Sequence, residues 1–179
     1  MKNNYFKTIN DYNDDVLARV ALMKKLSEVS PIFPKFHFEI NDKKIKQISL
    51  PIKSCKWPDD KNDLENLWKE FKNEIFTIHK YGYVHGDILK KNILFDGYRL
   101  RLIDHELFLV IGRELRVTFP WVATEDLMHG HVSQKTDLIC IKATELRLFD
   151  YENYRKFRVM QNELISTVTK SINYSAEKN

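Results

Sequence analysis

The stretch HGDILKKNILFDGYRLRLIDHE, residues 85–106, decides how this chain is interpreted. It places Asp87 in a loop, Asn92 five residues later, and Asp104 further along the chain. Between Asn92 and Asp104 lie two short apolar segments, separated by the Asp-Gly pair at 96–97, which is a strong signal for a tight hairpin turn. The hairpin returns the chain, so that Asn92 and Asp104 can face one cavity.

These side-chain types, in this order, are the ones that phosphoryl transfer requires. The carboxylate of Asp87 can orient an attacking hydroxyl and accept its proton. Asn92 and Asp104 can hold Mg²⁺ against the phosphates of a nucleotide, and hard oxygen ligands suit Mg²⁺ better than zinc. A lone His-Gly-Asp would be a weak signal, so the interpretation depends on further blocks of sequence in the right order.

On these residues the sequence resembles the protein-kinase-like superfamily. His85-Gly86-Asp87 with Asn92 is similar to the catalytic loop of that superfamily, and residues 103–106, Ile-Asp-His-Glu, are similar to its metal-binding loop. The glycine after the histidine, and the His-Glu pair after the metal aspartate, are similar to aminoglycoside and choline phosphotransferases.

Two blocks further along the chain resemble protein kinases instead. Residues 118–125, TFPWVATE, resemble the end of a protein-kinase activation segment, with Thr124 where proline is usual. Asp137 opens an apolar helix and resembles the buried aspartate that braces the catalytic loop. The linked blocks cover about residues 78–149. A chance match is disfavoured because six residues recur in the expected order: Asp87, Asn92, Asp104, Trp121, Glu125 and Asp137.

The resemblance implies an α+β, two-lobed, protein-kinase-like fold in a single domain, residues 1–179. Its N-lobe, residues 1–55, would be reduced, and its C-lobe, residues 56–179, would be shortened and mainly helical. Apolar periodicity gives a matching order of elements. It predicts helices over 14–29, 63–80, 135–149 and 151–172, and strands over 5–9, 35–40, 44–50, 83–85, 93–95 and 100–103.

The N-terminal part departs from the pattern of the family. None of the five glycines lies before Gly82, so we expect neither the glycine-rich phosphate loop nor the two strands around it. The first predicted strand then resembles the strand that carries the phosphate-binding lysine, which makes Lys7 the candidate. The next helix is basic in its middle, where the family has a glutamate, and Asp14 or Asp15 could pair with Lys7 only if the helix begins beside it.

The catalytic loop also departs from the family. Gly86 replaces the arginine that, in regulated protein kinases, pairs with a phosphate on the activation segment, so any activity would not await such a phosphorylation. Leu89 replaces the usual lysine, and Lys91 stands where some tyrosine kinases have an arginine that could neutralise the transferred phosphoryl group. The resemblance thus implies ATP and Mg²⁺ as cofactors and the following site: catalytic Asp87 and Lys91, nucleotide-binding Lys7, Asn92 and Asp104, and metal-binding Asn92 and Asp104.

Composition argues against several other classes of protein. The 179 residues are 43% hydrophobic and 30% charged, which allows a folded core, and the apolar runs are too short to span a bilayer. The first residues lack a signal-peptide pattern, so we expect a cytoplasmic location, with delivery into a host cell as an analogy to compact effector kinases. Cys55 and Cys140 form neither a disulfide framework nor a metal-ligand pair by spacing.

Charge does not argue for a nucleic-acid partner. The net charge of +4 is spread along the chain. Lysines do gather between residues 43 and 61, beside Trp57, but a strand edge protected by lysines explains them better than a nucleic-acid surface does.

Three functions are compatible with the sequence. The first is a minimal, ATP- and Mg²⁺-dependent kinase acting on a Ser, Thr or Tyr hydroxyl of a protein substrate, which residues 118–125 and the intact Asp87, Asn92 and Asp104 favour. The second is a pseudokinase that binds a protein partner, which the missing glycine-rich loop and helix glutamate favour. The third is a small-molecule or sugar kinase, although little acceptor-binding helical region follows residue 149. The sequence indicates no oligomeric state.

Overall fold

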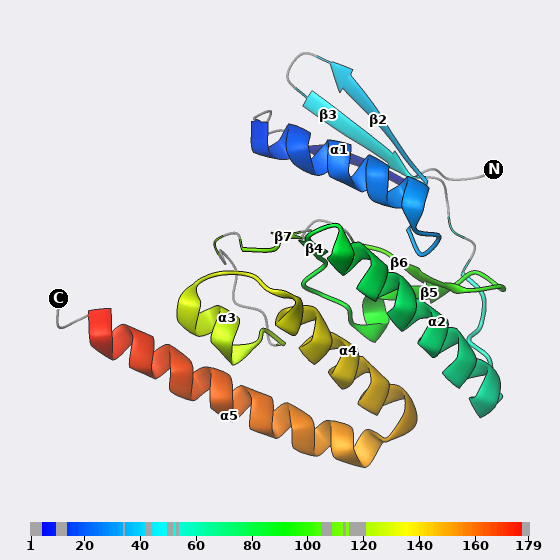
Figure 1. Ribbon diagram of the computed structural model, residues 1–179. Coiled ribbons are helices and arrows are strands. Elements are labelled where there is room, and N and C mark those ends of the chain that lie inside the picture. Colours follow the sequence, from blue (N-terminus) through cyan, green and yellow to red (C-terminus); the bar gives the residue numbers. More distant parts are fainter. Residues whose placement is uncertain are drawn as a thin grey trace. The chain divides into compact units, whose positions relative to one another are not determined.

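The computed structural model describes residues 5–9, 14–33, 35–41, 44–49, 52, 54–104, 109–112, 114 and 121–176 (Figure 1). In chain order its elements are β1 (Tyr5–Ile9), α1 (Asp14–Val29), β2 (Phe36–Asn41), β3 (Lys44–Ser49), α2 (Lys61–Lys80), β4 (Tyr83–Val84), the 3₁₀ helix η1 (Lys90–Asn92), β5 (Ile93–Phe95), β6 (Leu100–Leu102), β7 (Leu109–Val110), α3 (Thr124–His129), α4 (Gln134–Phe149) and α5 (Tyr151–Ala176). The predicted order of strand, helix, hairpin, helix, short strands and helices is confirmed.

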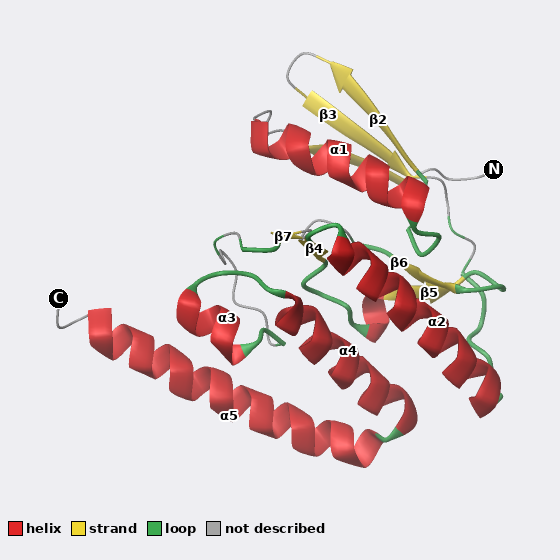
Figure 2. Cartoon of the chain, viewed as in Figure 1, coloured by secondary structure: helices red, strands yellow, loops and turns green. Residues whose placement is uncertain are grey.

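The chain divides into two compact units rather than one continuous body. The first contains residues 1–78 and 93–103, and the second contains residues 79–92 and 104–179. The predicted division into an N-lobe of 1–55 and a C-lobe of 56–179 stays a prediction. Colouring by secondary structure distinguishes the three-stranded sheet, which belongs to the first unit, from the long helices α4 and α5, which belong to the second (Figure 2).

An antiparallel sheet in the order β1-β3-β2 forms the N-terminal part of the first unit. The predicted hairpin is confirmed, since β2 and β3 pair up to the Asn41–Lys44 partners beside the turn. β1 pairs with the other edge of β3 and places Lys7 opposite Gln47. The helix α1 lies against β2 and ends at Val29, two residues before Pro31, because a proline disfavours helical backbone in the residue that precedes it.

The long helix α2 buries the apolar stripe that its sequence period predicts. Trp68 stacks on Phe71 with their ring centroids 5.4 Å apart, and Ile75 and Ile78 continue the stripe at full burial. In the same unit, β5 and β6 form the hairpin expected around residues 96–97.

Local chemistry fixes the turn of the β5–β6 hairpin. One carboxylate oxygen of Asp96 accepts hydrogen bonds from the backbone N–H groups of Tyr98 and Arg99, each at 2.9 Å. Gly97 has a φ of 100°, a conformation that a residue without a Cβ adopts at little cost. The Asp-Gly pair therefore predicts this turn because both of its residues stabilise the backbone conformation of the turn.

Helices dominate the second unit. The hydroxyl of Ser133 caps α4 by accepting the backbone N–H of Lys135 at 3.2 Å, and α5 packs against both α3 and α4. α5 continues to Ala176, four residues past its predicted end. The short helix α3 was not predicted, because six residues are too few to show a helical period. No helix in the described ranges combines the length and apolar composition needed to cross a membrane.

Candidate active site

The predicted catalytic loop lies between β4 and η1, and its own backbone holds it in a tight conformation. The N–H of Leu89 donates to the carbonyl of Asp87 at 2.9 Å, and the N–H of Asn92 donates to the carbonyl of Leu89 at 2.8 Å. Gly86 has a φ of 83°, in the left-handed region that glycine tolerates best. The glycine that distinguishes this loop from that of regulated protein kinases thus suits the backbone conformation of the loop.

Asp87 is positioned by the two residues that the sequence analysis grouped with it. The side-chain amide of Asn92 donates to Asp87 Oδ2 at 2.7 Å and to the Asp87 carbonyl at 3.0 Å. Lys91 Nζ lies 3.1 Å from the same Oδ2 atom. The Asp87 side chain is 15% exposed and that of Lys91 is 65% exposed, so the carboxylate can still be reached from solvent. Both contacts fall on Oδ2 rather than on Oδ1.

The hydrogen bonds of Asn92 also determine which of its two side-chain amide atoms is the oxygen and which is the nitrogen. Both acceptors on Asp87, a carbonyl and a carboxylate, require the amide nitrogen to face them. The Oδ1 atom of Asn92 is therefore the one that can bind a cation, as the predicted metal role requires. The Asn92 side chain is buried, so its orientation is set by these hydrogen bonds rather than by solvent.

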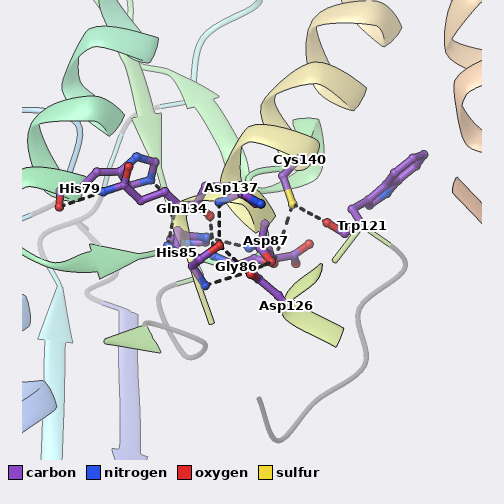
Figure 3. Close-up of polar contacts among 12 residues, drawn as sticks. His79, His85, Gly86, Asp87, Trp121, Asp126, Gln134, Asp137 and Cys140 are labelled. Carbon is purple, nitrogen blue, oxygen red and sulfur yellow. Dashed lines mark hydrogen bonds and ion pairs between the residues drawn. The ribbon is translucent and has the colours of Figure 1, made fainter. Parts of the chain in front are cut away.

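Asp137, near the start of α4, braces the loop (Figure 3). It is fully buried and accepts the backbone N–H of His85 at 2.9 Å and that of Gly86 at 2.7 Å. Its Oδ2 atom also lies 2.9 Å from Nε2 of His79, at the end of α2. The prediction that Asp137 is a buried acceptor of loop N–H groups is confirmed. It holds the two residues that immediately precede Asp87.

Two further side chains of α4 contact the same loop, and neither was predicted. The hydroxyl of Thr144 donates to the carbonyl of Ile88 at 2.8 Å. The sulfur of Cys140 lies 3.8 Å from the carbonyl of Gly86 and 3.7 Å from that of Trp121, as Figure 3 shows. Burial, reinforced by the nearby charge of Asp137, raises the pKa of the Cys140 thiol well above its usual range, so it stays protonated as a weak donor.

The segment that follows the predicted end of the activation segment is tied to the start of α4 by the carboxylate of Asp126. Asp126 is buried and accepts the N–H and hydroxyl of Ser133 at 2.9 and 2.6 Å, and the hydroxyl of Thr136 at 2.6 Å. Its neighbour Glu125 is 53% exposed and pairs with Lys135 at 3.1 Å. The backbone N–H of Glu125, and then Lys135, lower the pKa of the Glu125 carboxyl.

Trp121 belongs to the core of the second unit. It is 7% exposed, and its ring stacks on that of Phe157 in α5 with the centroids 5.9 Å apart and the planes 5° apart. Tyr154, one turn earlier on α5, lies 6.0 Å from the Trp121 ring. The residues 118–120 that precede Trp121 in the predicted block lie outside the described residues.

The remaining predicted residues are Asp104, two residues after β6, and Lys7, in the middle of β1. Asp104 follows β6, is exposed, and has a φ of 61°, which is unusual for a residue with a side chain. Because Ile93 pairs with Leu102, Asn92 and Asp104 flank the same end of the hairpin. The backbone of Lys7 is described in β1, but its side chain is outside the described part of the chain, as are His105 and Glu106. No structural result therefore bears on the contacts of Lys7.

Comparison with known proteins finds the fold but no close relative. No protein-family model matches the chain, and no curated protein matches it. Solved structures do match, among them that of PK-1, a kinase of Cydia pomonella granulovirus. The TM-score is 0.61 at 18% sequence identity, and the match covers 80% of this chain but only 60% of that kinase. The chain therefore has a mixed α/β, kinase-like fold, which confirms the predicted fold in this coarser form.

Proposed function

We propose that this protein is an ATP- and Mg²⁺-dependent phosphotransferase, a minimal kinase that transfers a phosphoryl group to a hydroxyl group of a protein. The observation that carries the proposal is the position of Asp87. Its carboxylate is held by the Asn92 amide on one oxygen atom, within a loop braced by the buried Asp137, and it remains 15% exposed. General-base catalysis requires a carboxylate that is held in one orientation and that the hydroxyl can still reach to give up its proton.

In the proposed reaction Asp87 orients the acceptor hydroxyl and takes up its proton as the oxygen attacks the γ-phosphorus of ATP. The bond from that phosphorus to the bridging oxygen breaks, and ADP leaves. Positioning and charge neutralisation supply most of the stabilisation in such a transfer. Lys91, 3.1 Å from Asp87 and 65% exposed, is long and mobile enough to meet the phosphoryl oxygens when substrate binds.

The residues present fit a magnesium ion. The amide oxygen of Asn92 and the exposed carboxylate of Asp104 are hard ligands at the same end of the β5–β6 hairpin. Mg²⁺ is usually held by one or two protein oxygens together with water and phosphate, so a larger cluster of carboxylates is not needed. When bound there, the ion would neutralise charge on the nucleotide phosphates. Lys7 is the proposed lysine for those phosphates.

A protein acceptor is proposed because of the segment that follows the catalytic loop in sequence. Residues 118–125 resemble the end of an activation segment, and the described part of that block is firmly anchored in the second unit. Trp121 is anchored by its stack on Phe157, and the backbone N–H of Ala123 donates to the hydroxyl of Thr136 at 3.3 Å. The solved structure that resembles this chain is also named a kinase, which supports the reaction class by analogy.

A specific observation favours a second candidate, a pseudokinase that binds a protein partner. Residues 1–81 contain no glycine, so they cannot form the glycine-rich loop with which most kinases cover the nucleotide phosphates. Nucleotide binding separates the two candidates, because a minimal kinase must bind Mg-ATP and a pure binding module need not.

The test is the substitution Asp87→Asn, assayed with γ-labelled ATP, Mg²⁺, and casein and histone as acceptors. The amide is nearly isosteric and its oxygen can still accept the Asn92 hydrogen bond, but it cannot take up a proton. Transfer should fall about 10²–10⁴-fold, with unchanged Mg-ATP affinity. The matched control is Asp59→Asn, because Asp59 also pairs with a lysine, Lys56 at 2.6 Å, but is 82% exposed. Equal activity of Asp87→Asn and the control would exclude Asp87 as the base. Absence of Mg-ATP binding by the unmodified protein would favour the pseudokinase.

A further inference from the structure

The loop that carries Asp87 is bound by α4 on both sides of that residue. On the side that precedes Asp87, Asp137 accepts the N–H groups of residues 85–86. On the side that follows, the hydroxyl of Thr144 donates to the carbonyl of Ile88 at 2.8 Å. Thr144 is 1% exposed and Ile88 is fully buried, so water does not compete for this hydrogen bond.

The carbonyl of Ile88 depends on α4, whereas its neighbours are satisfied within the loop. The carbonyl of Asp87 accepts from the backbone N–H of Leu89 at 2.9 Å and from the Asn92 side chain at 3.0 Å. The carbonyl of Leu89 accepts from the backbone N–H of Asn92 at 2.8 Å. A buried carbonyl must find a donor, and for Ile88 the donor is Thr144.

The hydrogen bond of Thr144 is unusual for a threonine within a helix. Such hydroxyls commonly donate to the carbonyl one turn earlier in their own helix. Thr167 in α5 does this, with its hydroxyl 2.9 Å from the carbonyl of Glu163. Thr144 instead reaches a residue 56 positions away in sequence. Its hydroxyl therefore fixes the loop to the helix.

We propose that Thr144 is a positioning residue for Asp87. Asp137 and Thr144 hold the peptide groups that flank Asp87, so that its carboxylate is presented in one orientation. Without the Thr144 hydroxyl, the Ile88 peptide group would turn to find another donor, and Asp87 would turn with it. The consequence for catalysis rests on the proposed function, whereas the ordering of the loop does not.

Three variants distinguish the effect of the Thr144 hydroxyl from the effect of the shape of its side chain. Thr144→Val keeps the volume and removes the donor, and Thr144→Ser keeps the donor. The matched control is Thr167→Val, the same change at an exposed helical threonine outside the site. If Thr144→Val does not fold, Thr144→Cys replaces it, because a thiol is a much weaker donor.

Two measurements are made on each variant. The first is amide hydrogen exchange at Leu89 and Asn92, whose N–H groups close the loop. Thr144→Val should exchange there about 10- to 100-fold faster, while Thr144→Ser and Thr167→Val should match the unmodified protein. The second is phosphate transfer, in which Thr144→Val should lower kcat about 10- to 100-fold and leave the KM for ATP within about twofold.

The two measurements separate this inference from the proposed function. If the unmodified protein transfers no phosphate, the proposed function fails, and hydrogen exchange alone decides whether Thr144 orders the loop. Exchange at Leu89 and Asn92 that is the same in Thr144→Val and Thr167→Val would overturn the positioning role. So would a loss in kcat that Thr144→Ser does not restore, because the hydroxyl would then not be the group that matters.

Discussion

Removal of the Asp137 carboxylate by Asp137→Ala should destabilise the second unit more than any surface substitution. Asp137 is fully buried and accepts two backbone N–H groups, from His85 at 2.9 Å and Gly86 at 2.7 Å, and it lies 2.9 Å from the His79 ring nitrogen. Alanine offers no acceptor in place of these oxygens. All three nitrogen atoms would lose this partner at once.

The size of the loss in stability follows from the number of buried N–H groups that lose their acceptor. Each buried N–H left unpaired costs about 1–3 kcal/mol, so the two backbone groups together account for about 2–6 kcal/mol. Removing one partner from a buried, charged hydrogen-bond cluster typically costs about 3–5 kcal/mol, which agrees with that sum. For a chain of this length the loss corresponds to a fall in Tm of about 10 °C or more. Such a loss is a large part of the stability of an ordinary domain.

Urea denaturation and thermal melting measure the effect, with two companion variants. Asp137→Asn keeps the volume but presents an amide nitrogen to one of the donors, so it should still lose about 1–3 kcal/mol. Asp59→Ala removes an exposed carboxylate and should stay within about 0.5 kcal/mol of the unmodified protein. The reasoning is refuted if Asp137→Ala unfolds at the same urea concentration as Asp59→Ala. It is also refuted if Asp137→Asn is as stable as the unmodified chain, because the loss in alanine would then reflect volume alone.

Two further predictions concern the hairpin and the residue after it. Asp104→Ala should leave the Tm without ligand unchanged, because Asp104 is exposed. The same substitution should abolish the rise in Tm that Mg-ATP causes. An undiminished rise would exclude Asp104 from the metal site. Asp96→Asn should lower the free energy of unfolding at pH 7 by about 1–3 kcal/mol. Burial by itself raises the pKa of Asp96, but hydrogen bonds from Arg99, Arg101 and Tyr98 outweigh burial and lower that pKa. The Asp96 contribution is therefore full above the unfolded-state pKa and is lost as the pH falls through the folded-state pKa. The two proteins should converge in stability once the pH lies below the folded-state pKa of Asp96, and a difference that persists at the acid end of the titration would contradict this origin.

The parts of the fold that local chemistry determines could be predicted from the sequence. The Asp-Gly pair at 96–97 predicts the β5–β6 hairpin because the Asp96 side chain and the backbone of Gly97 both suit that turn. The stripe from Trp68 to Ile78 predicts α2 because it repeats at helical spacing. The contact of Asn92 with Asp87 was not predicted, although a separation of five residues in a tight loop keeps the two side chains close.

The contacts that join distant segments could not be predicted from local pattern. Thr144 reads as an ordinary helical residue, and its partner Ile88 lies in another part of the sequence. Asp126 and Glu125 are adjacent carboxylates, and only the packing of α3 decides that Asp126 is the buried one. The spacing along α4 does carry one signal, since Asp137, Cys140 and Thr144 recur three and four positions apart and so form a polar stripe on one face of the helix.

That polar stripe fixes the loop that carries Asp87 through hydrogen bonds from a single helix. Asp137, Cys140 and Thr144 lie on one face of α4, and their contacts are with residues 85–88. A loop fixed in this way needs α4 and the end of α2, which are both present. The stripe thus allows the position of Asp87 to be tested by substitutions on one helix, without any change to residues that would touch nucleotide.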